Sequence, residues 1–193
     1  MQLSHRVRLA CAAMRIQPAP LDGLWIVDLD VRDDAERLGA SFREIFHAEV
    51  FRAAGVPSFA PVQWNISESR AGTLRGFHAE PWTKLVHPAA GRVFAAIADI
   101  RRDSPTAGTT WTGELDRTRA LLVGDGLANG FQALSEVAVY AYLVDAHWSP
   151  TDRYPAVAWD DPDLAVEWPI TDDRLALSSR DRSNPTLRSF WDG

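Results

Sequence analysis

Between residues 61 and 144 the chain is a succession of short apolar segments separated by turn signals. We expect strands at 62–67, 84–87, 92–100, 110–115, 119–123, 131–134 and 137–144, where β-branched, aromatic and alternating apolar residues gather. Proline, glycine and aspartate mark turns at 88–91, 104–108 and 124–126. Many short strands at such spacing predict an all-β sandwich, jelly roll or barrel.

The segments before residue 61 carry weaker patterns. Residues 24–31 read as a further strand with partial alternation. Ser41 and Glu44 have the spacing of a capping box, which predicts a helix that begins near Ser41 and ends before Gly55 and Pro57. A few short helices are therefore expected beside the strands.

The 193 residues, of which 46% are hydrophobic, suit a single domain over residues 1–193. Within it, residues 1–20 are expected to be a loose N-terminal extension. Residues 151–193, irregular and rich in Pro, Asp and Trp, are expected to wrap the barrel as a tail that can deliver side chains to its mouth. No apolar run approaches the ~20 residues of a membrane span, and residues 7–14 lack a convincing secretory cleavage site.

Charge and cysteine content narrow the possible partners. Cys11 is the only cysteine, which excludes an intrachain disulfide and is consistent with a cytoplasmic location. The net charge of −6 argues against general nucleic-acid binding, which needs a basic face. A small anionic ligand remains possible, because a few placed arginines suffice to bind it.

The densest polar cluster holds the only lysine of the chain. Lys84 lies within ten residues of Arg75, His78 and Glu80 in β-rich sequence, whereas every other cationic side chain outside the histidines is arginine. The cluster is either a solvated strand edge or a functional site. Lys84 is either the one lysine that remains in a sequence whose codon usage favours arginine, or a lysine required as a compact positive charge. On 137–144, Tyr140 and Tyr142 share one face of the expected strand, and either face can be the interior.

Short motifs, each different, follow one another along most of the chain. They lie at 42–44, 61–67, 74–78 with Lys84, 99–101, 104–106, 126–131, Tyr142, 148–150, 161–162, 168–169 and 177–181. Their order and spacing resemble the dTDP-4-dehydrorhamnose 3,5-epimerase family, and His-Ala-Glu-Pro-Trp at 78–82 resembles one subgroup of it. The resemblance implies a cupin-type jelly roll.

The resemblance also implies a reaction, the epimerisation at C3, C5 or both of a dTDP-4-keto-6-deoxy hexose in deoxysugar biosynthesis. It makes His78 the base that removes a proton and Asp181 the carboxylate that orients it. Lys84 would stabilise the enolate near the keto oxygen, and Tyr142 would return a proton on the far face. An imidazole with a reference pKa near ~6.5 suits proton transfer at neutral pH, and a fixed cation suits a developing enolate.

Further residues match the family's substrate contacts. Arginine geometry suits diphosphate oxygens, and polar or aromatic groups suit the sugar and the nucleotide. By resemblance the substrate-binding residues are Arg75 and Arg180 at the diphosphate, Gln63, Asn65 and Asn129 at polar positions, and Phe42 and Glu44 toward the nucleotide. The family also implies a homodimer and a reaction that needs no cofactor.

Two positions depart from the family pattern. Gly39 stands where the family usually has an arginine, and the nearby Arg37 is out of register; Asn129 stands where most members have histidine. These departures favour altered nucleotide affinity or reaction scope. They also motivate an alternative function, a non-catalytic sugar-nucleotide-binding cupin that has lost turnover.

The same pattern bears on metals. Metal-binding cupins carry a glycine, five residues and a His-x-His pair, followed by a third histidine. Here Gly72 leads to His78 at that spacing, but Glu80 and Asn129 occupy the other two positions. We therefore expect no metal, and a metal-dependent oxygenase or isomerase is the weaker enzymatic alternative.

Overall fold

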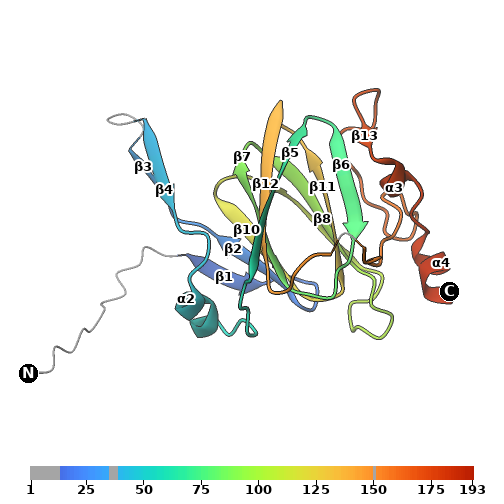
Figure 1. Ribbon diagram of the computed structural model, residues 1–193, viewed down its shortest axis with the longest axis horizontal. Helices are drawn as coiled ribbons and strands as arrows, with labels where there is room; N and C mark the ends of the chain where they lie inside the picture. The colour runs from blue at the N-terminus through green and yellow to red at the C-terminus, as the bar shows by residue number, and fades with distance from the viewer. Residues whose placement is uncertain (1–13, 35–38, 150) are drawn as a thin grey trace, which may run out of the picture.

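The computed structural model describes residues 14–34, 39–149 and 151–193 (Figure 1). Two residues named in the sequence analysis, Cys11 and Arg37, lie outside these ranges. Two β-sheets form the body of the molecule. The expected all-β fold with a few short helices is confirmed.

The larger sheet has six strands and the smaller has five. The larger contains, in spatial order, β1 (Arg15–Pro18), β2 (Leu24–Asp28), β10 (Arg119–Val123), β7 (Lys84–Ala90), β12 (Val137–Val144) and β5 (Gln63–Arg70). The smaller contains β13 (Ala176–Leu177), β6 (Thr73–His78), β11 (Leu127–Ala133), β8 (Val93–Asp99) and β9 (Thr110–Leu115). Neighbouring strands pair antiparallel, except that β13 pairs parallel with β6.

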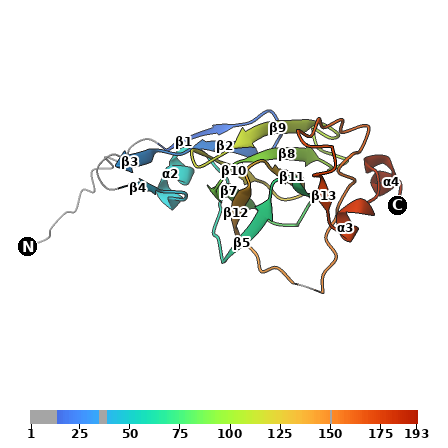
Figure 2. The same ribbon diagram turned by 90° about the horizontal axis from the view of Figure 1, so that it is seen from above.

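A hairpin and three helices complete the described structure. They are β3 (Val31–Asp34) with β4 (Ala40–Arg43), α2 (Ala48–Ala53), α3 (Ser179–Arg182) and α4 (Leu187–Asp192). The hairpin projects from the barrel at the end opposite α3 and α4, as two perpendicular views show (Figures 1 and 2). We call this hairpin the arm.

Strand β8 shows why the two sheets pack together. Alternate residues of a strand point to opposite faces of the sheet. Val93, Ala95 and Ile97 enter the core between the two sheets, whereas Ala96 and Ala98 enter a second core on the outer face of the smaller sheet. Because both faces of β8 are buried, its sequence is almost continuously apolar.

The C-terminal tail covers that outer face. Val157, Leu164, Trp168 and Leu187 pack in the second core, so the tail shields the smaller sheet from water. The outer face of the larger sheet is covered by a third core that includes Phe51 of α2.

Several expected boundaries agree with the structure and others differ. Strands at 110–115, 119–123 and 137–144 have the predicted limits, but β7 continues to Ala90, so the turn expected at 88–91 begins later. Residues 24–31 divide into β2 and the start of β3. The expected loose extension already contains β1, which pairs with β2. Strand β6, in the polar cluster, was not among the expected strands.

The helix predicted to start at Ser41 is wrong. Ser41 lies in β4 and pairs with Asp33 of β3, and the helix begins only at Ala48, after the N-cap residue His47. The spacing of Ser41 and Glu44 is a local signal, and pairing of β4 with β3 satisfies the same backbone groups that a helix would.

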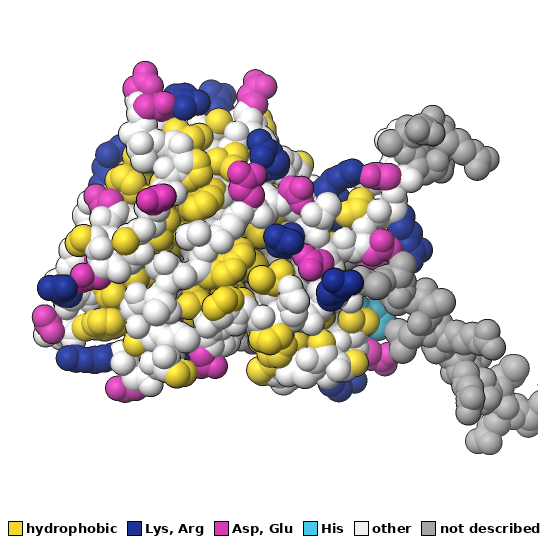
Figure 3. Space-filling model, turned by 180° about the vertical axis from the view of Figure 1, so that it is seen from behind, with side chains coloured by type: hydrophobic (Ala, Val, Ile, Leu, Met, Phe, Trp, Pro, Cys, Tyr) yellow, Lys and Arg dark blue, Asp and Glu magenta, His cyan; other side chains and the backbone are white. Residues whose placement is uncertain are grey.

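The surface carries charge of both signs. Seen from behind, acidic and basic side chains are interspersed rather than gathered into a basic patch (Figure 3). None of the helices in the described ranges is long and apolar enough to cross a membrane.

Candidate active site

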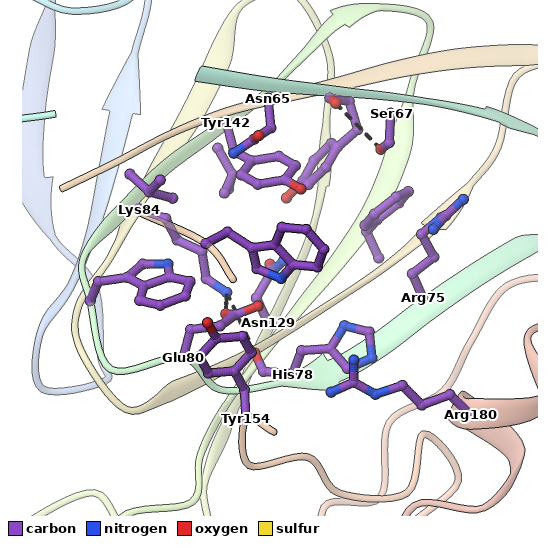
Figure 4. Close-up of a pocket in the computed structure, with 16 residues that line it drawn as sticks. Asn65, Ser67, Arg75, His78, Glu80, Lys84, Asn129, Tyr142, Tyr154 and Arg180 are labelled. Carbon is purple, nitrogen blue, oxygen red and sulfur yellow. Dashed lines mark hydrogen bonds and ion pairs between the residues drawn. The ribbon is translucent and has the colours of Figure 1, made fainter. Parts of the chain in front are cut away.

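A cavity of about 230 Å³ opens between the two sheets. Strands of both sheets and the tail contribute to its lining (Figure 4). Its polar lining residues are Asn65, Ser67, Arg75, His78, Glu80, Lys84, Asn129, Tyr140, Tyr142, Tyr154 and Arg180. The polar cluster predicted from the sequence is therefore part of a concave site rather than a solvated strand edge.

An irregularity in β6 places both Arg75 and His78 in this cavity. Regular alternation would point residues three apart to opposite faces. Arg75 pairs with Phe131 and His78 with Asn129, so three steps on β6 match two on β11. The bulge occurs at Gly76, whose φ is +129°, and a Cβ there would collide with the backbone of Gly130. Glycine at position 76 is what brings the two side chains to one face.

His78 contacts Asp181 across 103 positions of sequence. The distance from His78 Nε2 to Asp181 Oδ1 is 2.6 Å, which is a short hydrogen bond. Asp181 is buried, whereas the histidine side chain is 26% exposed and lines the cavity. Because Nε2 is engaged by the carboxylate, Nδ1 is the ring nitrogen that can exchange a proton with a molecule in the cavity.

The start of α3 holds Asp181 in place. Ser178 is the N-cap of this helix: its hydroxyl accepts from the Asp181 backbone N–H at 3.1 Å and donates to Asp181 Oδ2 at 2.7 Å. Burial alone would raise the pKa of Asp181. Hydrogen bonds from His78, Ser178 and the Gly76 backbone, with the nearby His78 charge, outweigh burial, and the pKa lies below its ordinary value. Asp181 is therefore a carboxylate at neutral pH.

Lys84 enters the cavity from β7 and is 5% exposed. Its ammonium forms an ion pair with Glu80, which follows β6, and donates to the His78 carbonyl at 3.5 Å. A buried ammonium needs such a partner to remain charged. The single lysine therefore lies in the cavity wall, paired with Glu80 and in contact with the backbone of His78.

Tyr142 reaches the cavity from β12. The structure decides the face that the sequence left open: Ala138, Tyr140 and Tyr142 point inward, and Leu143 packs on the outer face. Burial raises the pKa of the Tyr142 phenol, the charge of Glu80 raises it further, and Arg75 opposes the rise. The phenol is protonated at neutral pH and can donate a proton.

The remaining predicted residues of the barrel lie around the same space. Arg75 and Arg180 lie together on one side of the cavity (Figure 4). Asn65 lines it from β5 and accepts from the Gln63 amide at 2.7 Å, so Gln63 holds Asn65 without lining the cavity itself. Asn129 lies directly opposite His78 on β11.

Phe42 and Glu44 are not brought to this cavity. Phe42 is part of β4 in the arm, which projects away from the barrel, and its side chain is 59% exposed (Figure 1). Glu44 follows β4 directly, and neither residue lines the cavity. Within one chain these two residues are separated from the other predicted site residues.

Sequence reasoning missed several lining residues. Ser67 shares a face of β5 with Asn65, a signal that the alternation of the strand already contained. Trp148 belongs to the motif at 148–150 and Tyr154 to the tail, but neither had been assigned to the site. Trp82 sits in the loop between β6 and β7 and packs edge-on against Tyr154, with ring centroids 4.9 Å apart.

The residues at the metal positions of metal-binding cupins are otherwise engaged. Glu80 pairs with Lys84, and Asn129 supplies an amide in place of an imidazole. In the part of the chain that the structure describes, no three His, Cys, Asp or Glu side chains gather in a way that could hold a metal ion.

Comparison with known proteins identifies the family of the chain. Residues 18–189 match the family dTDP-4-dehydrorhamnose 3,5-epimerase. The enzyme of that name from Pseudomonas aeruginosa is 37% identical over 147 residues, covering 73% of this chain and 80% of its own.

Two solved structures share the fold. RmlC from Streptococcus suis in complex with dTDP-D-xylose superposes with a TM-score of 0.85 at 32% identity, covering 93% of this chain and 94% of its own. NovW from Streptomyces spheroides, a 4-keto-6-deoxy sugar epimerase, superposes with a TM-score of 0.84 at 30% identity, covering 94% and 91%. The cupin-type fold is confirmed, and the chain belongs to the dTDP-4-dehydrorhamnose 3,5-epimerase family.

Proposed function

We propose that the chain epimerises a dTDP-4-keto-6-deoxy hexose at C3, C5 or both, in deoxysugar biosynthesis. The observation that carries the proposal is the 2.6 Å contact between His78 and Asp181 at the cavity wall, with Lys84 and Tyr142 in the same cavity. The family match and relatives that act on dTDP-4-keto sugars support it.

The first step is proton removal. The 4-keto group acidifies the hydrogens on both neighbouring carbons, and Nδ1 of His78 takes one of them. Asp181 stabilises the imidazolium that results and fixes the tautomer of the neutral ring. The electron pair of the broken C–H bond moves to the keto oxygen, and the Lys84 ammonium stabilises that enolate.

The second step returns a proton to the opposite face of the ring. One base cannot serve both faces of a ring that does not turn over, so inversion needs a second group. Tyr142 is protonated at neutral pH and lines the cavity on a strand of the other sheet from His78. It donates its phenolic proton to the carbon and completes inversion.

Arginine side chains bind the diphosphate. Arg75 and Arg180 both line the cavity on one side, and each can donate two parallel hydrogen bonds to phosphate oxygens. Asn65, held by Gln63, and Asn129 contact polar groups of the ligand. The cavity has the scale of a sugar ring, so the diphosphate and the base extend toward its mouth.

The arm points to a homodimer. Phe42 and Glu44 cannot contact a nucleotide in the cavity of their own chain, because the arm projects away from it (Figure 2). Exposed apolar side chains occur on the arm and on the edge strand β5, namely Phe42, Trp64 and Ile66. Apolar patches of this kind are typical of association surfaces. In a dimer the arm delivers Phe42 and Glu44 to the nucleotide of the other subunit. A cytoplasmic location remains a prediction from the sequence.

Solvent deuterium incorporation tests the function. A dTDP-4-keto-6-deoxy hexose is incubated with the protein in D₂O, and label at C3 and C5 is followed by NMR. Label at C3, C5 or both, with inversion there, is expected for the wild type. His78→Ala is expected to abolish exchange at the carbon it serves, while calorimetry still detects dTDP-sugar binding.

Tyr142→Phe separates the two steps, since it removes the proton and keeps the shape. His78 can still remove and return a proton on one face, so label enters while inversion falls by about 100-fold. A wild-type protein that binds the nucleotide sugar and incorporates no label would instead be a binding protein without turnover. Inversion by Tyr142→Phe at nearly the normal rate would assign the acid role to another group.

A further inference from the structure

The inner part of the cavity contains two polar groups that the proton-transfer steps do not use. Tyr140 is 1% exposed and stacks on Phe131, with ring centroids 4.1 Å apart and an interplanar angle of 26°. Its hydroxyl and Oδ1 of Asn129 are both buried, and by distance and angle neither forms a hydrogen bond with a described residue, although the two side chains lie close enough to interact. Both residues line the cavity.

A buried polar atom without a partner costs stability, so such a group calls for an explanation. Phenylalanine at position 140 would keep the stacking on Phe131 and avoid that cost. Packing therefore accounts for the ring of Tyr140 but not for its hydroxyl. The polar pair is explained if a molecule that enters the cavity supplies the missing hydrogen bonds.

The pair is placed where the reacting ring must lie. Asn129 lies directly opposite His78 in the pairing of β11 with β6. Tyr140 precedes Tyr142 by two residues on the same face of β12. The two groups therefore lie among the residues assigned to proton removal and proton return.

Tyr140 is suited to hydrogen bonding rather than to acid catalysis. Burial raises the pKa of its phenol, and donation from the Asn129 side-chain amide to the phenol oxygen only partly opposes the rise. Such donation uses neither the phenol proton nor Asn129 Oδ1. A phenol in this state keeps its proton and remains a hydrogen-bond donor.

We propose that Tyr140 and Asn129 form a specificity subsite that binds a hydroxyl group of the hexose ring. The proposal rests on the proposed function, since it concerns the sugar of the same substrate. The sugar hydroxyl accepts a hydrogen bond from the Tyr140 phenol and donates one to Asn129 Oδ1. In a 4-keto-6-deoxy hexose bound to a nucleotide through C1, the free ring hydroxyls are those on C2 and C3.

The test compares three nucleotide sugars with two proteins. Wild type and Tyr140→Phe are assayed by deuterium incorporation with dTDP-4-keto-6-deoxyglucose and with its 2-deoxy and 3-deoxy analogues. A site built to bind a hydroxyl strongly rejects the analogue that lacks it, because its own polar groups stay unpaired. We expect the wild type to disfavour one analogue by about 100-fold or more in kcat/KM, and Tyr140→Phe to reduce this ratio to about 10-fold or less.

A matched variant and a stability measurement complete the design. Tyr154→Phe also removes a phenol from the cavity lining, but this hydroxyl is already bonded to the Ser149 backbone at 3.1 Å, so the ratio is expected to stay as in the wild type. Tyr140→Phe is expected to melt at the same temperature as the wild type or higher. A clearly lower melting temperature would show that the hydroxyl is a structural group, and would overturn the subsite.

A binding measurement distinguishes failure of the subsite from failure of the epimerase function. Calorimetry with the same three nucleotide sugars measures the preference without turnover. If the wild type incorporates no deuterium yet binds the hydroxylated sugar more tightly through Tyr140, the epimerase function fails and the subsite stands. Equal acceptance of all three sugars by the wild type, or a preference that Tyr140→Phe leaves unchanged, would overturn the subsite.

Discussion

Asp181 is bonded both to the start of α3 and to His78. Its Oδ2 accepts from Ser178, and its Oδ1 holds His78 at 2.6 Å. Asp181→Asn keeps the shape but removes the charge that stabilises an imidazolium and fixes its tautomer. Deuterium exchange at the substrate carbon is expected to slow by about 10³-fold, with dTDP-sugar affinity little changed.

The control for this substitution is Asp172→Asn, an exposed carboxylate paired with Arg174 in the tail. It removes the same charge at a distance from the cavity, and exchange is expected at the wild-type rate. Wild-type exchange by Asp181→Asn itself would remove Asp181 from the mechanism.

Comparison of the wild type with Asp181→Asn also tests the lowered pKa of Asp181. Its folded-state pKa is lowered, so the unfolded chain binds more protons at acid pH than the folded chain. The stability that the ionised carboxylate contributes is therefore fully present above the unfolded-state pKa, near ~3.9, and is lost as pH falls through the lower folded-state pKa. The difference in melting temperature between wild type and Asp181→Asn is expected to shrink as the pH falls below about 4.

At the scale of elements, Gln132 joins the tail to the barrel. It is fully buried on β11, and its amide donates to the Ile170 carbonyl at 2.7 Å and accepts from the Ile170 N–H at 2.9 Å. Gln132→Leu preserves volume but leaves both backbone groups unpaired. The free energy of unfolding in urea is expected to fall by about 2–4 kcal/mol.

Gln17→Leu is the matched control, since Gln17 is exposed on β1 and its change should shift stability by less than about 0.5 kcal/mol. The tail also carries Tyr154, Arg180 and Asp181, so Gln132→Leu is further expected to raise KM. Unchanged stability in this variant would mean that apolar contacts alone hold the tail on the sheet.

The arm is an element whose local signals were misleading. Ser41 and Glu44 have capping-box spacing, yet the chain there forms a strand because β3 is available as an antiparallel partner. Alternation along β12 correctly predicts that Tyr140 and Tyr142 share a face, but it does not tell which face of the strand points into the barrel. That decision came from the smaller sheet packing against β12 through Phe131.

At the scale of the whole molecule, two copies are expected to associate. Light scattering at micromolar concentration should give twice the 21.4 kDa mass of one chain. Phe42→Ala is expected to weaken dTDP binding, because in the proposed dimer the arm would contact the nucleotide of the partner. Only monomer in solution would contradict the dimer.

Mixing variants tests whether the arm acts across subunits. If it does, mixed dimers of His78→Ala with Phe42→Ala contain one cavity that has both an intact base and an intact arm. Activity at low substrate concentration should then exceed the mean of the two separate proteins. Val62→Ala, another exposed apolar change but outside the arm, serves as the control for Phe42. Activity equal to the mean would place the action of Phe42 within its own chain.

The sequence by itself determined the all-β class, most strands between residues 61 and 144 and the types of residue at the site. These features depend on local alternation, turn residues and motif order, which a chain carries without its fold. Tertiary structure alone decided how they combine. The bulge at Gly76 turns Arg75 and His78 to one face, and 103 positions of sequence separate His78 from Asp181. The tail brings Asp181 there because burying its apolar side chains against the smaller sheet outweighs the entropy of ordering it. No local pattern encodes that balance, and none encodes the separation of Phe42 from the cavity, since both follow from contacts between distant parts of the chain.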